Sequence, residues 1–548
     1  MTSPRDSLTF FDPSTRIWSG IKSPYQHDPN QSLGKLILDS LAKTPAKVTQ
    51  ISVDSGVQIT CGEMRNRTIR LAQNLTELGY GPGDIFTMAA RNGEHVAPVL
   101  FASLALGVPI NTLDPSFRRD DFSHMLSTVK PRLVFCDQET LPEMEVALGM
   151  IALKPELVIL GQKVEGYRHI TDLLKPTGRE ETFVPTRFED PSKQLAIIVC
   201  SSGTTGRSKG VCLSHSLCIA HFIGVMGCYP PDILLCFSSL YWLSGVVFLL
   251  LGTVTGAVRV ITRELFNPDL AFDIIEKYRV TLCFFAPAIV LQLVNHPRAL
   301  KANFSSVRAC MSGGASVTAA MKYSFEKLAP NCDFKIGYGM SEIGGVVSMT
   351  EKNYYKEGST GYIHPNVEVK VVDDSGNAVD INQEGEILIK PQFYFLGYYG
   401  NKEATDEILD QNGWIHSGDI GRIDKDGYLY IVDRKKDIIK YLSYQISPTE
   451  IETIIQSIPG VVNVCVAGVP VPGSDLPAAL VVKSKDMSLT EESIDRVVRQ
   501  KLSDYKQLRG GIHLVESLPM TPSGKVMRRS CRDIMEEFYT KQNDVIKR

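Results

Sequence analysis

The sequence has no Cys-x-x-Cys pair, although 12 cysteines are spread over its 548 residues. Cysteines paired at that spacing are typical of zinc sites and redox motifs, and a dense disulfide framework is typical of much shorter chains. The sequence therefore predicts neither a zinc site nor a set of disulfides. A reducing compartment is the simpler interpretation.

A strong excess of one charge is also missing. Lys and Arg number 58 against 61 Asp and Glu, which gives a formal net charge of -3. No basic stripe, fixed-period repeat or low-complexity tract interrupts the chain. These absences argue against nucleic-acid binding, a solenoid and extended disorder. We expect the partners to be small molecules.

Neither end of the chain carries a targeting signal that we recognise. Segment 1–18 contains Asp6 and Asp12 and no apolar core, unlike a secretory or mitochondrial leader. The last residues, 545–548, read Val-Ile-Lys-Arg instead of the Ser-Lys-Leu that directs proteins to peroxisomes. We therefore expect a cytoplasmic protein.

Charged residues are absent from 233–258, a stretch long enough to suggest a transmembrane helix. The stretch also contains hydroxyl side chains, which such helices use sparingly. These are Ser238, Ser239, Ser244, Thr253 and Thr255. We interpret the stretch as a buried helix and strand of a large domain and predict no transmembrane segment.

Enough apolar sequence is present, at 43% hydrophobic residues, for a large body and at least one smaller domain. Short apolar runs at 195–199, 258–261, 282–285 and 368–372 alternate with longer helix-like segments, which predicts layered α/β structure. After about residue 360, short strands are separated by turn sequences, which predicts a β-rich subdomain. The turns are Asp374-Ser375-Gly376-Asn377, Asn412-Gly413 and Asp426-Gly427.

The last hundred or so residues have an apolar pattern of their own, which begins after the charged run 433–437. A helix is predicted there by Ser447 as N-cap, by Pro448 at the first helical position, and by Glu450, which lies three residues after the cap and completes a capping box. Isoleucines at helical spacing follow, and Pro459-Gly460 ends the pattern. We predict a large domain over 1–433 and a small, mobile α+β domain over 434–548.

A loop rich in glycine and hydroxyl groups follows the apolar run 195–199. Its glycines expose backbone N–H groups, its hydroxyls add donors, and Lys209 adds a positive charge, so the loop is suited to binding phosphate. It does not match GxxxxGK[ST], so a Walker-type NTPase is not indicated. The loop comprises Ser201, Ser202, Gly203, Thr204, Thr205, Gly206, Arg207, Ser208, Lys209 and Gly210.

This loop resembles the signature of the adenylate-forming superfamily, which includes acyl- and aryl-CoA synthetases, 4-coumarate-CoA ligase-like proteins and firefly luciferases. Further matching motifs occur in the family's order along nearly the whole chain. They are Gly313-Gly314-Ala315, Tyr338-Gly339-Met340-Ser341-Glu342, 414–419, 427–440 and 519–525. The resemblance implies an acid–thiol ligase that uses ATP and Mg²⁺ to form an acyl-adenylate and then transfers the acyl group to coenzyme A, with release of AMP and pyrophosphate.

The resemblance also implies residue roles that agree with side-chain chemistry. Tyr338 would stack on adenine, Ser341 would contact the α-phosphate, and Glu342 would supply a hard oxygen ligand for Mg²⁺. Asp419 and Arg434 would bind the ribose hydroxyls. The backbone at Gly313, Gly314, Ala315 and Gly339 would lie against the nucleotide, where a side chain would clash.

Two lysines of the small domain would act in different half-reactions. Lys525, on a Pro- and Gly-rich turn, corresponds to the family's adenylation lysine, whose point charge would stabilise the reacting carboxylate and phosphate. Lys440 would serve thioester formation after the small domain rotates about 433–436. Relatives commonly have Lys-Gly before Tyr-Gln where this chain has Leu442 and Ser443, so efficient use of CoA is the weakest part of the prediction.

The acyl pocket differs from that of luciferases, which carry His-His-Gly-Phe where this chain reads Tyr241-Trp242-Leu243-Ser244. Trp242, Gly344 and Gly345 are candidates to line an apolar slot for a fatty or aryl acid, and Trp242 as an ordinary core residue is the alternative. A luciferase-like monooxygenase and a non-catalytic nucleotide or lipid-acid sensor remain as alternative functions. The family resemblance also leaves a peroxisomal location open.

Overall fold

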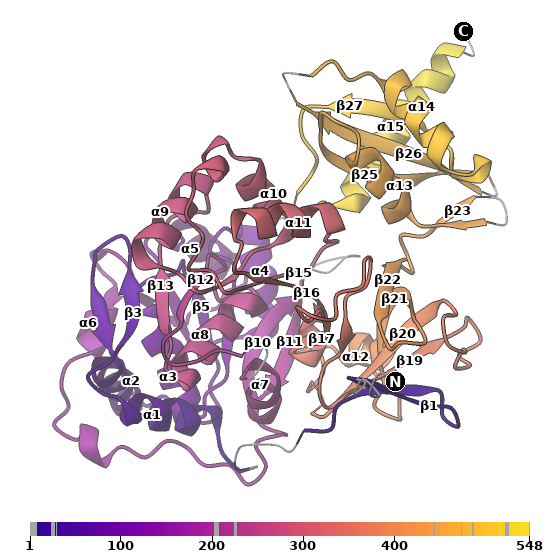
Figure 1. Cartoon of the computed structure of the whole chain (residues 1–548). Coiled ribbons are helices and arrows are strands. Elements are labelled where there is room, and N and C mark those ends of the chain that lie inside the picture. The colour runs from indigo at the N-terminus through magenta and orange to yellow at the C-terminus, as the bar shows by residue number, and fades with distance from the viewer. Residues whose placement is uncertain are drawn as a thin grey trace.

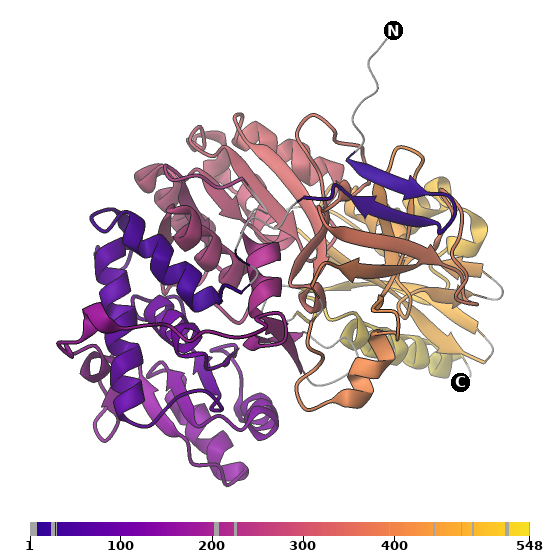
Figure 2. The same cartoon turned by 90° about the horizontal axis from the view of Figure 1, so that it is seen from below.

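The computed structural model forms a large body and a smaller C-terminal body, which is joined to it after β22 and sits to one side (Figure 1). Figure 2 shows the same two parts from below, with the N-terminal hairpin lying against the β-rich part of the large body. The structure describes residues 8–23, 28, 30–201, 208–223, 227–393, 395–441, 444–472, 474–484, 487–520 and 525–546.

Two mixed sheets form the layered part of the large body, as the alternating apolar runs predict. In the first, the strands lie in the order β11 (Lys209–Ser214), β10 (Leu195–Ser201), β6 (Ile110–Thr112), β5 (Phe86–Ala89), β7 (Leu133–Cys136), β8 (Glu156–Ile159) and β9 (Arg168–His169). In the second, the order is β18 (Tyr362–Ile363), β17 (Gly345–Met349), β16 (Asp333–Met340), β15 (Ala309–Gly313), β14 (Leu282–Phe284), β12 (Ile233–Cys236), β13 (Val258–Ile261), β3 (Val48–Ser52) and β4 (Gln58–Thr60).

Helices that pack on one another fill the space between these two sheets, and every residue of α3 is buried. They are α1 (Leu33–Lys43), α2 (Cys61–Glu77), α3 (Val96–Leu106), α7 (His215–Phe222) and α8 (Leu243–Thr255). Other helices cover the outer faces or the edges of the sheets. They are α4 (Arg119–Val129), α5 (Leu141–Met150), α6 (Ile170–Leu173), α9 (Pro268–Tyr278), α10 (Pro287–Asn295) and α11 (Ala319–Leu328).

The uncharged stretch 233–258 is the buried helix and strand that the sequence indicates. Strand β12 opens it, α8 of 13 residues occupies its centre, and β13 begins at its end. Among the described residues, no helix combines the length and the apolar character needed to cross a bilayer.

An antiparallel sheet forms the β-rich subdomain, in the order β1 (Thr9–Asp12), β2 (Ile17–Gly20), β19 (Val367–Val372), β20 (Gly385–Pro391), β21 (Ile415–Ile423) and β22 (Leu429–Arg434). The predicted turn Asp426-Gly427 joins β21 and β22 as a hairpin. The turn at 374–377 folds the chain back to a bridge between Val372 and Ala378, within the longer connection from β19 to β20. The third, Asn412-Gly413, instead leads from α12 (Lys402–Ile408) into β21, where a single bridge joins Leu409 and Ile415.

The smaller body is an α+β unit. Strands β25 (Val461–Val471), β26 (Ser474–Lys483) and β27 (Gly511–Val515) form its main sheet, and β23 (Ile439–Tyr441) and β24 (Tyr444–Ile446) form a hairpin. Its helices are α13 (Pro448–Gln456), α14 (Glu491–Lys501) and α15 (Arg528–Ile546). The fold class predicted from the sequence is therefore confirmed in both bodies.

Helix α13 begins as predicted, because the Ser447 hydroxyl accepts a hydrogen bond from the backbone N–H of Glu450. The expected return bond from the Glu450 carboxylate is replaced by a contact with Lys506, whose Nζ lies 2.6 Å from both carboxylate oxygens. A charged donor makes a stronger hydrogen bond than a backbone N–H, which favours this arrangement.

Candidate active site

A cavity of 1150 Å³ lies where the carboxyl ends of both layered sheets meet the start of the small body. Ser201 ends β10, Phe284 ends β14, Gly313 ends β15 and Met340 ends β16, and all four line the cavity. Ligands commonly bind at this edge of open α/β sheets. Lys525 of the small body lines the same cavity, so groups from both bodies converge there.

A buried carboxylate links the layered part of the body to the β-rich subdomain at one wall of the cavity. Asp419, on β21, is only 4% exposed. Its Oδ2 accepts a hydrogen bond from the Tyr338 hydroxyl at 2.6 Å, and its Oδ1 lies 2.6 Å from Arg434 Nε. Burial raises the pKa of Asp419, and the neighbouring guanidinium opposes that shift. The three residues that the sequence assigns to adenine and ribose are thus in direct contact.

A second network surrounds Glu342, which is 8% exposed at the end of the cavity nearest β11. Glu342 Oε1 accepts a hydrogen bond from the Tyr398 hydroxyl at 2.6 Å, and the Lys209 ammonium lies 4.9 Å from the centre of the Tyr398 ring. Burial and the Glu342 carboxylate raise the pKa of Tyr398, which therefore stays a hydrogen-bond donor at neutral pH.

Tyr398 was not predicted from the sequence. It reaches the site because the backbone of 397–399 runs beside β11, with bonds from Cys212 N to Gly397 O and from Tyr399 N to Gly210 O. The left-handed backbone at Gly397 and Gly400 marks the turn that contains it. The Gly-Tyr-Tyr-Gly sequence at 397–400 is typical of a turn. It does not predict that this turn lies beside β11 or that Tyr398 contacts Glu342.

Replacing Tyr398 with phenylalanine is expected to lower the free energy of unfolding by about 1–3 kcal/mol, because the buried Glu342 carboxylate loses a hydrogen-bond donor. Urea titration of both proteins measures this difference. Tyr399→Phe, at the half-buried neighbouring residue, is the matched control and is expected to change stability far less. Equal losses in the two variants would contradict a specific contribution from the bond to Glu342.

The predicted phosphate-binding loop is described only at its two ends. Residues Ser202, Gly203, Thr204, Thr205 and Gly206 lie outside the described part of the chain. Ser201 and Lys209 face each other across the β10–β11 ladder, and both line the cavity. The loop between them therefore starts and ends at the cavity wall.

Glycine is favoured at three positions in and next to β15 and β16, for different structural reasons. A Cβ on Gly313 would lie 2.4 Å from the carbonyl oxygen of Gly337 on β16, and a Cβ on Gly339 would lie 2.0 Å from that of Gly345 on β17. Gly314 instead has a φ of +84°, which favours glycine. The backbone at Gly313, Gly314 and Gly339 lines the cavity, as does Ala315.

A group of apolar residues lines one part of the cavity. Trp242 and Gly345 line it as predicted, whereas Gly344, in a left-handed turn against Leu217, is not part of the lining. Trp242 also packs edge-on against Tyr241, with ring centres 4.6 Å apart, so its core and pocket interpretations both hold. Other apolar side chains complete this region, among them Val247, Phe248, Phe284, Ile289 and Met311.

His221 is a cavity residue that the sequence did not single out. It is buried, and its Nδ1 has no hydrogen-bond partner among the described residues. Burial lowers the pKa of His221 to about 3, so the ring is neutral at physiological pH. A histidine inside an apolar helix such as α7 gives no signal in the sequence that distinguishes a cavity residue from a core residue.

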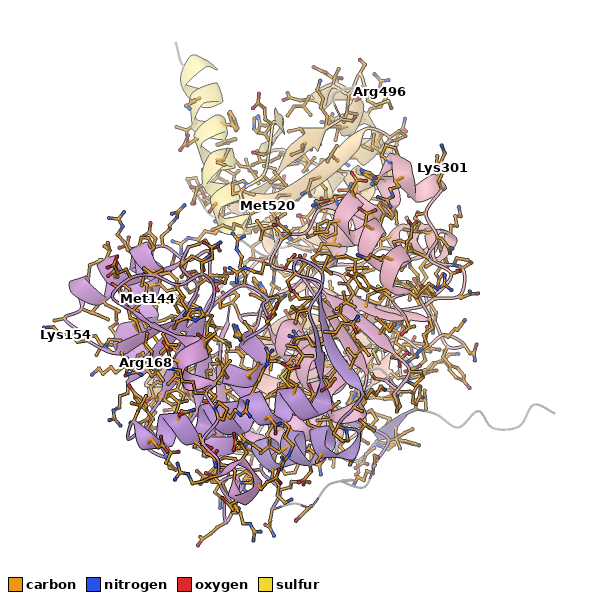
Figure 3. The ribbon with its side chains drawn as sticks, turned by 90° about the vertical axis from the view of Figure 1, so that its left-hand side faces the viewer. Met144, Lys154, Arg168, Lys301, Arg496 and Met520 are labelled. Carbon is orange, nitrogen blue, oxygen red and sulfur yellow. The ribbon has the colours of Figure 1, made fainter. Side chains whose placement is uncertain are left out.

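Lys525 lines the cavity next to the bridge that joins Met520 and Val526. Met520 lies on the side of the small body that faces the large body, whereas Arg496 on α14 lies on the far side (Figure 3). Burial lowers the pKa of Lys525, and the nearby Arg434 adds to this shift. Residues 521–524 of the predicted lysine loop lie outside the described residues.

Lys440 is not brought to the cavity in this arrangement. It is exposed on β23, and its backbone N–H donates to Asp475 at 3.2 Å within the small body. Leu442 and Ser443, which depart from the family's pattern, lie outside the described residues. The two lysines of the small body are therefore presented differently, one inside the cavity and one at the surface.

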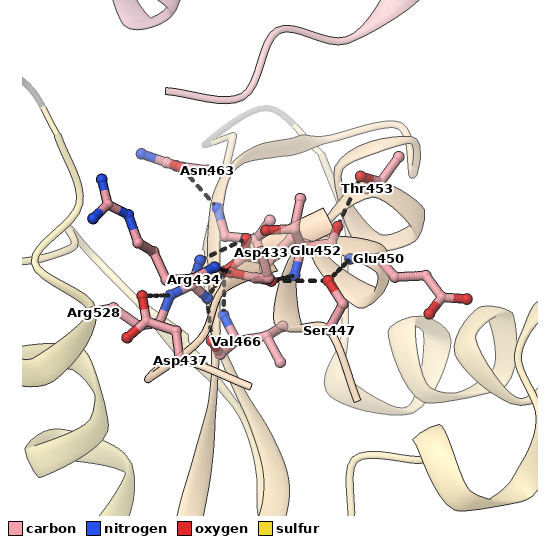
Figure 4. Close-up of polar contacts among 12 residues, drawn as sticks. Asp433, Arg434, Asp437, Ser447, Glu450, Glu452, Thr453, Asn463, Val466 and Arg528 are labelled. Carbon is pink, nitrogen blue, oxygen red and sulfur yellow. Dashed lines mark hydrogen bonds and ion pairs between the residues drawn. The ribbon is translucent and has the colours of Figure 1, made fainter. Parts of the chain in front are cut away.

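The connection between the two bodies is held by charged side chains (Figure 4). Asp433, at the end of β22, accepts hydrogen bonds from the Ser447 hydroxyl at 2.8 Å and from the backbone N–H of Thr449 at 3.0 Å, both at the start of α13. Arg528 pairs with Glu452 at 2.5 Å and lies 3.6 Å from Asp437. This network positions the segment that carries Lys525.

The side chains around Glu342 limit which metal ions the site could bind. Among the described residues, no group of three or more metal-binding side chains is found. A buried carboxylate beside a polyphosphate is nevertheless sufficient for Mg²⁺, which usually keeps waters and phosphate oxygens as its other ligands. The residues present therefore fit Mg²⁺ bound together with a nucleotide and do not form a separate metal site.

Comparison with known proteins agrees with this geometry. The "AMP-binding enzyme" family model matches residues 38–399, and the "AMP-binding enzyme C-terminal domain" model matches 450–525. The chain is 28% identical to the probable 4-coumarate–CoA ligase 1 of Dictyostelium discoideum, over 92% of this chain and 95% of that protein. It is 30% identical to the luciferin 4-monooxygenase of Photuris pensylvanica, over 87% and 90%.

Solved structures share the fold. The anthranilate CoA ligase AuaEII, in complex with anthranoyl-AMP, matches with a TM-score of 0.84 at 22% identity, over 94% of this chain and 99% of that one. The luciferase-like enzyme of the nonluminescent mealworm Zophobas morio matches with a TM-score of 0.70 at 29% identity, over 76% and 99%. A nucleotide-sized cavity with these residues, and family models that match both bodies, lead to one conclusion: the chain belongs to the AMP-binding enzymes, the adenylate-forming superfamily.

Proposed function

We propose that this protein is an ATP-dependent acyl-CoA synthetase that activates a fatty or aryl carboxylic acid as its acyl-adenylate and then forms the CoA thioester. The observation that carries the proposal is the convergence of Lys525, Arg434, Tyr338 and Glu342 on one cavity, with Asp419 behind its wall in contact with Tyr338 and Arg434. Family members named as 4-coumarate–CoA ligases support the acid–thiol ligase class.

In the proposed first half-reaction, the substrate carboxylate attacks the α-phosphate of ATP and pyrophosphate leaves. Asp419 and Arg434 would hold the ribose, and the Tyr338 ring would stack on adenine beside Gly314 and Ala315. The hydroxyl of Ser341 and the ammonium of Lys525 would contact the reacting phosphate and carboxylate oxygens, and a fixed cation in a largely dry cavity stabilises the developing charge.

The β- and γ-phosphates would lie against the loop from Ser201 to Lys209, with Ser202, Gly203, Thr204, Thr205 and Gly206 as donors. Bound Mg²⁺ would neutralise phosphate charge, and Glu342 would supply its protein ligand, held in place by Tyr398. Trp242 and Gly345 would contact the acyl group, while Gly344 would shape the turn between Glu342 and the pocket.

For the second half-reaction we propose that the body 434–548 rotates against 1–433 about 433–436 and brings Lys440 to the site. The contacts of Asp433 with Ser447 and Thr449 would have to change in that step. The exposed position of Lys440 and the position of Lys525 in the cavity are those expected of an enzyme poised for adenylation.

ATP–pyrophosphate exchange across a panel of fatty and aryl acids tests this proposal. We expect exchange that depends on the acid and on Mg²⁺, together with an acyl-CoA product when CoA is added. Adenylate formation without a thioester product would exclude an acid–thiol ligase and indicate that the acyl group is transferred to an acceptor other than CoA. Oxygen-dependent light emission would favour a monooxygenase. Nucleotide binding without any exchange would indicate a sensor.

A further inference from the structure

A buried arginine that the proposed reaction does not use lies behind the acyl end of the cavity. Arg259 is on β13, beneath α8, and is 8% exposed. Its Nη1 has no hydrogen-bond partner among the described residues, and no ion pair is found for its guanidinium there. By contrast, the nearby cavity residue Arg263 is paired with both Asp137 and Glu139 at 3.1 Å.

The charge of Arg259 is therefore not compensated by the protein around it. Burial lowers the pKa of Arg259 to about 10, which leaves the guanidinium protonated at neutral pH. The titratable group that acts on it is the Cys236 thiol, and burial raises the pKa of that thiol, so it stays neutral. An isolated buried charge is costly, and proteins usually pair such a group.

The local sequence accommodates this side chain. A central parallel strand normally carries Val, Ile or Leu, as at the neighbouring Val258 and Val260. The helix above has glycine at 252, where a Cβ would lie 3.6 Å from Arg259 Cγ and 3.3 Å from a methyl group of Leu234. The arginine stem therefore packs closely beside α8 at Gly252.

A small void beside Arg259 adjoins the cavity. Its volume is 10 Å³, about the space of one water molecule. Arg259 and Cys236 line it, and it shares Asn92, Ser238 and Phe248 with the wall of the main cavity. Asn92 Nδ2 donates to the carbonyl oxygens of Phe237 and Ser238 at 3.3 and 3.1 Å, so the shared wall presents a polar amide beside the apolar Phe248.

We propose that Arg259 forms a distal anion subsite, and that the preferred substrate is a dicarboxylic acid whose second carboxylate is directed at this guanidinium. The inference rests on the proposed function and names its substrate class. One oxygen of the distal carboxylate would occupy the void, and the remaining atoms would lie in the main cavity along Phe248. The reacting carboxylate would lie at the other end, near Lys525.

The test uses straight-chain α,ω-dicarboxylic acids of graded length, each paired with its monomethyl ester, which keeps the length and removes the distal charge. Pyrophosphate exchange gives kcat/KM for both members of a pair. At the best length, wild-type protein is expected to prefer the diacid by about 10- to 100-fold, the range for a hydrogen bond to a charged group. Arg259→Met should bring this ratio close to one, and Arg259→Lys should restore part of it.

Lys277→Met, which removes an exposed cation on α9, is the control and should leave the ratio unchanged. The wild-type ratio needs no variant, so it is informative even if Arg259→Met fails to fold. A wild-type ratio near one, as expected if a water molecule satisfies Arg259, would overturn the proposal. The proposal is also overturned if chloride stabilises wild-type protein through Arg259 while the diacids have no higher kcat/KM than their half-esters.

Failure of the proposed function gives a different result. If no acid supports exchange, thermal stabilisation by the same diacids and half-esters still measures binding. A larger shift in melting temperature with the diacid than with its half-ester, abolished in Arg259→Met, supports the subsite without catalysis. Equal shifts with both compounds would overturn it.

Discussion

Replacing Lys525 with alanine is expected to lower the rate of acyl-adenylate formation from ATP by about 100- to 1000-fold, the loss typical of removing one group that stabilises a developing charge. Lys525 lines the cavity with Glu342 and Arg434, and its burial removes the water that would otherwise screen its charge. Single-turnover formation of adenylate with labelled ATP measures the effect.

The same variant should still form acyl-CoA from supplied acyl-adenylate at close to the wild-type rate. Lys440→Ala is the matched partner, because this lysine is exposed in the present arrangement, and it should show the opposite pattern: normal adenylate formation and slow thioester formation. Equal loss of both half-reactions in Lys525→Ala would refute the proposed division of roles between the two lysines.

Replacing Asp419 with asparagine is expected to raise KM for ATP by about 10- to 100-fold, since each hydrogen bond to a charged group contributes about 1.5–3 kcal/mol. The amide keeps the size of the side chain but removes its negative charge. In the wild-type protein, one carboxylate oxygen lies 2.6 Å from Arg434 Nε, and the other accepts a hydrogen bond from the Tyr338 hydroxyl at 2.6 Å. The loss should appear in nucleotide binding, measured by titration with a non-hydrolysable ATP analogue, and to a smaller extent in stability.

Asp424→Asn is the control for Asp419→Asn. Asp424 is also a buried carboxylate of the β-rich subdomain, and it accepts from Lys356 at 2.6 Å and from the Tyr430 hydroxyl at 3.0 Å, away from the cavity lining. Its replacement should lower stability without changing the affinity for ATP. If both variants weakened nucleotide binding equally, the effect of Asp419→Asn would be a general consequence of instability.

Features that depend on neighbouring residues were predicted well. The turn sequences at 374–377 and 426–427 reverse the chain because glycine adopts positive φ there, at Gly376 and Gly427. The start of α13 follows from the hydroxyl of Ser447 and the fixed φ of Pro448. Both depend on interactions over a few residues, which the order of amino acids determines directly.

Contacts between distant segments were not predicted. Tyr398 and Glu342 are 56 positions apart, and Asp419 and Tyr338 are 81 apart, yet each pair is joined by a bond of 2.6 Å. The Glu450 carboxylate binds Lys506, which is 56 positions away, in place of the local capping partner. Motif matching placed Tyr338 and Asp419 in one site without indicating that they touch, and gave no indication of Tyr398.

The sequence by itself predicted the layered architecture and the start of α13, because residue period, turn chemistry and capping act over short distances, and its motifs indicated the candidate nucleotide-binding residues. Only the tertiary structure decided that Lys525 lies in the cavity while Lys440 is exposed, and that the buried Arg259 has no ion-pair partner among the described residues. Those outcomes depend on which segments fold against one another, and the electrostatic state of a side chain depends on the neighbours it acquires in that process.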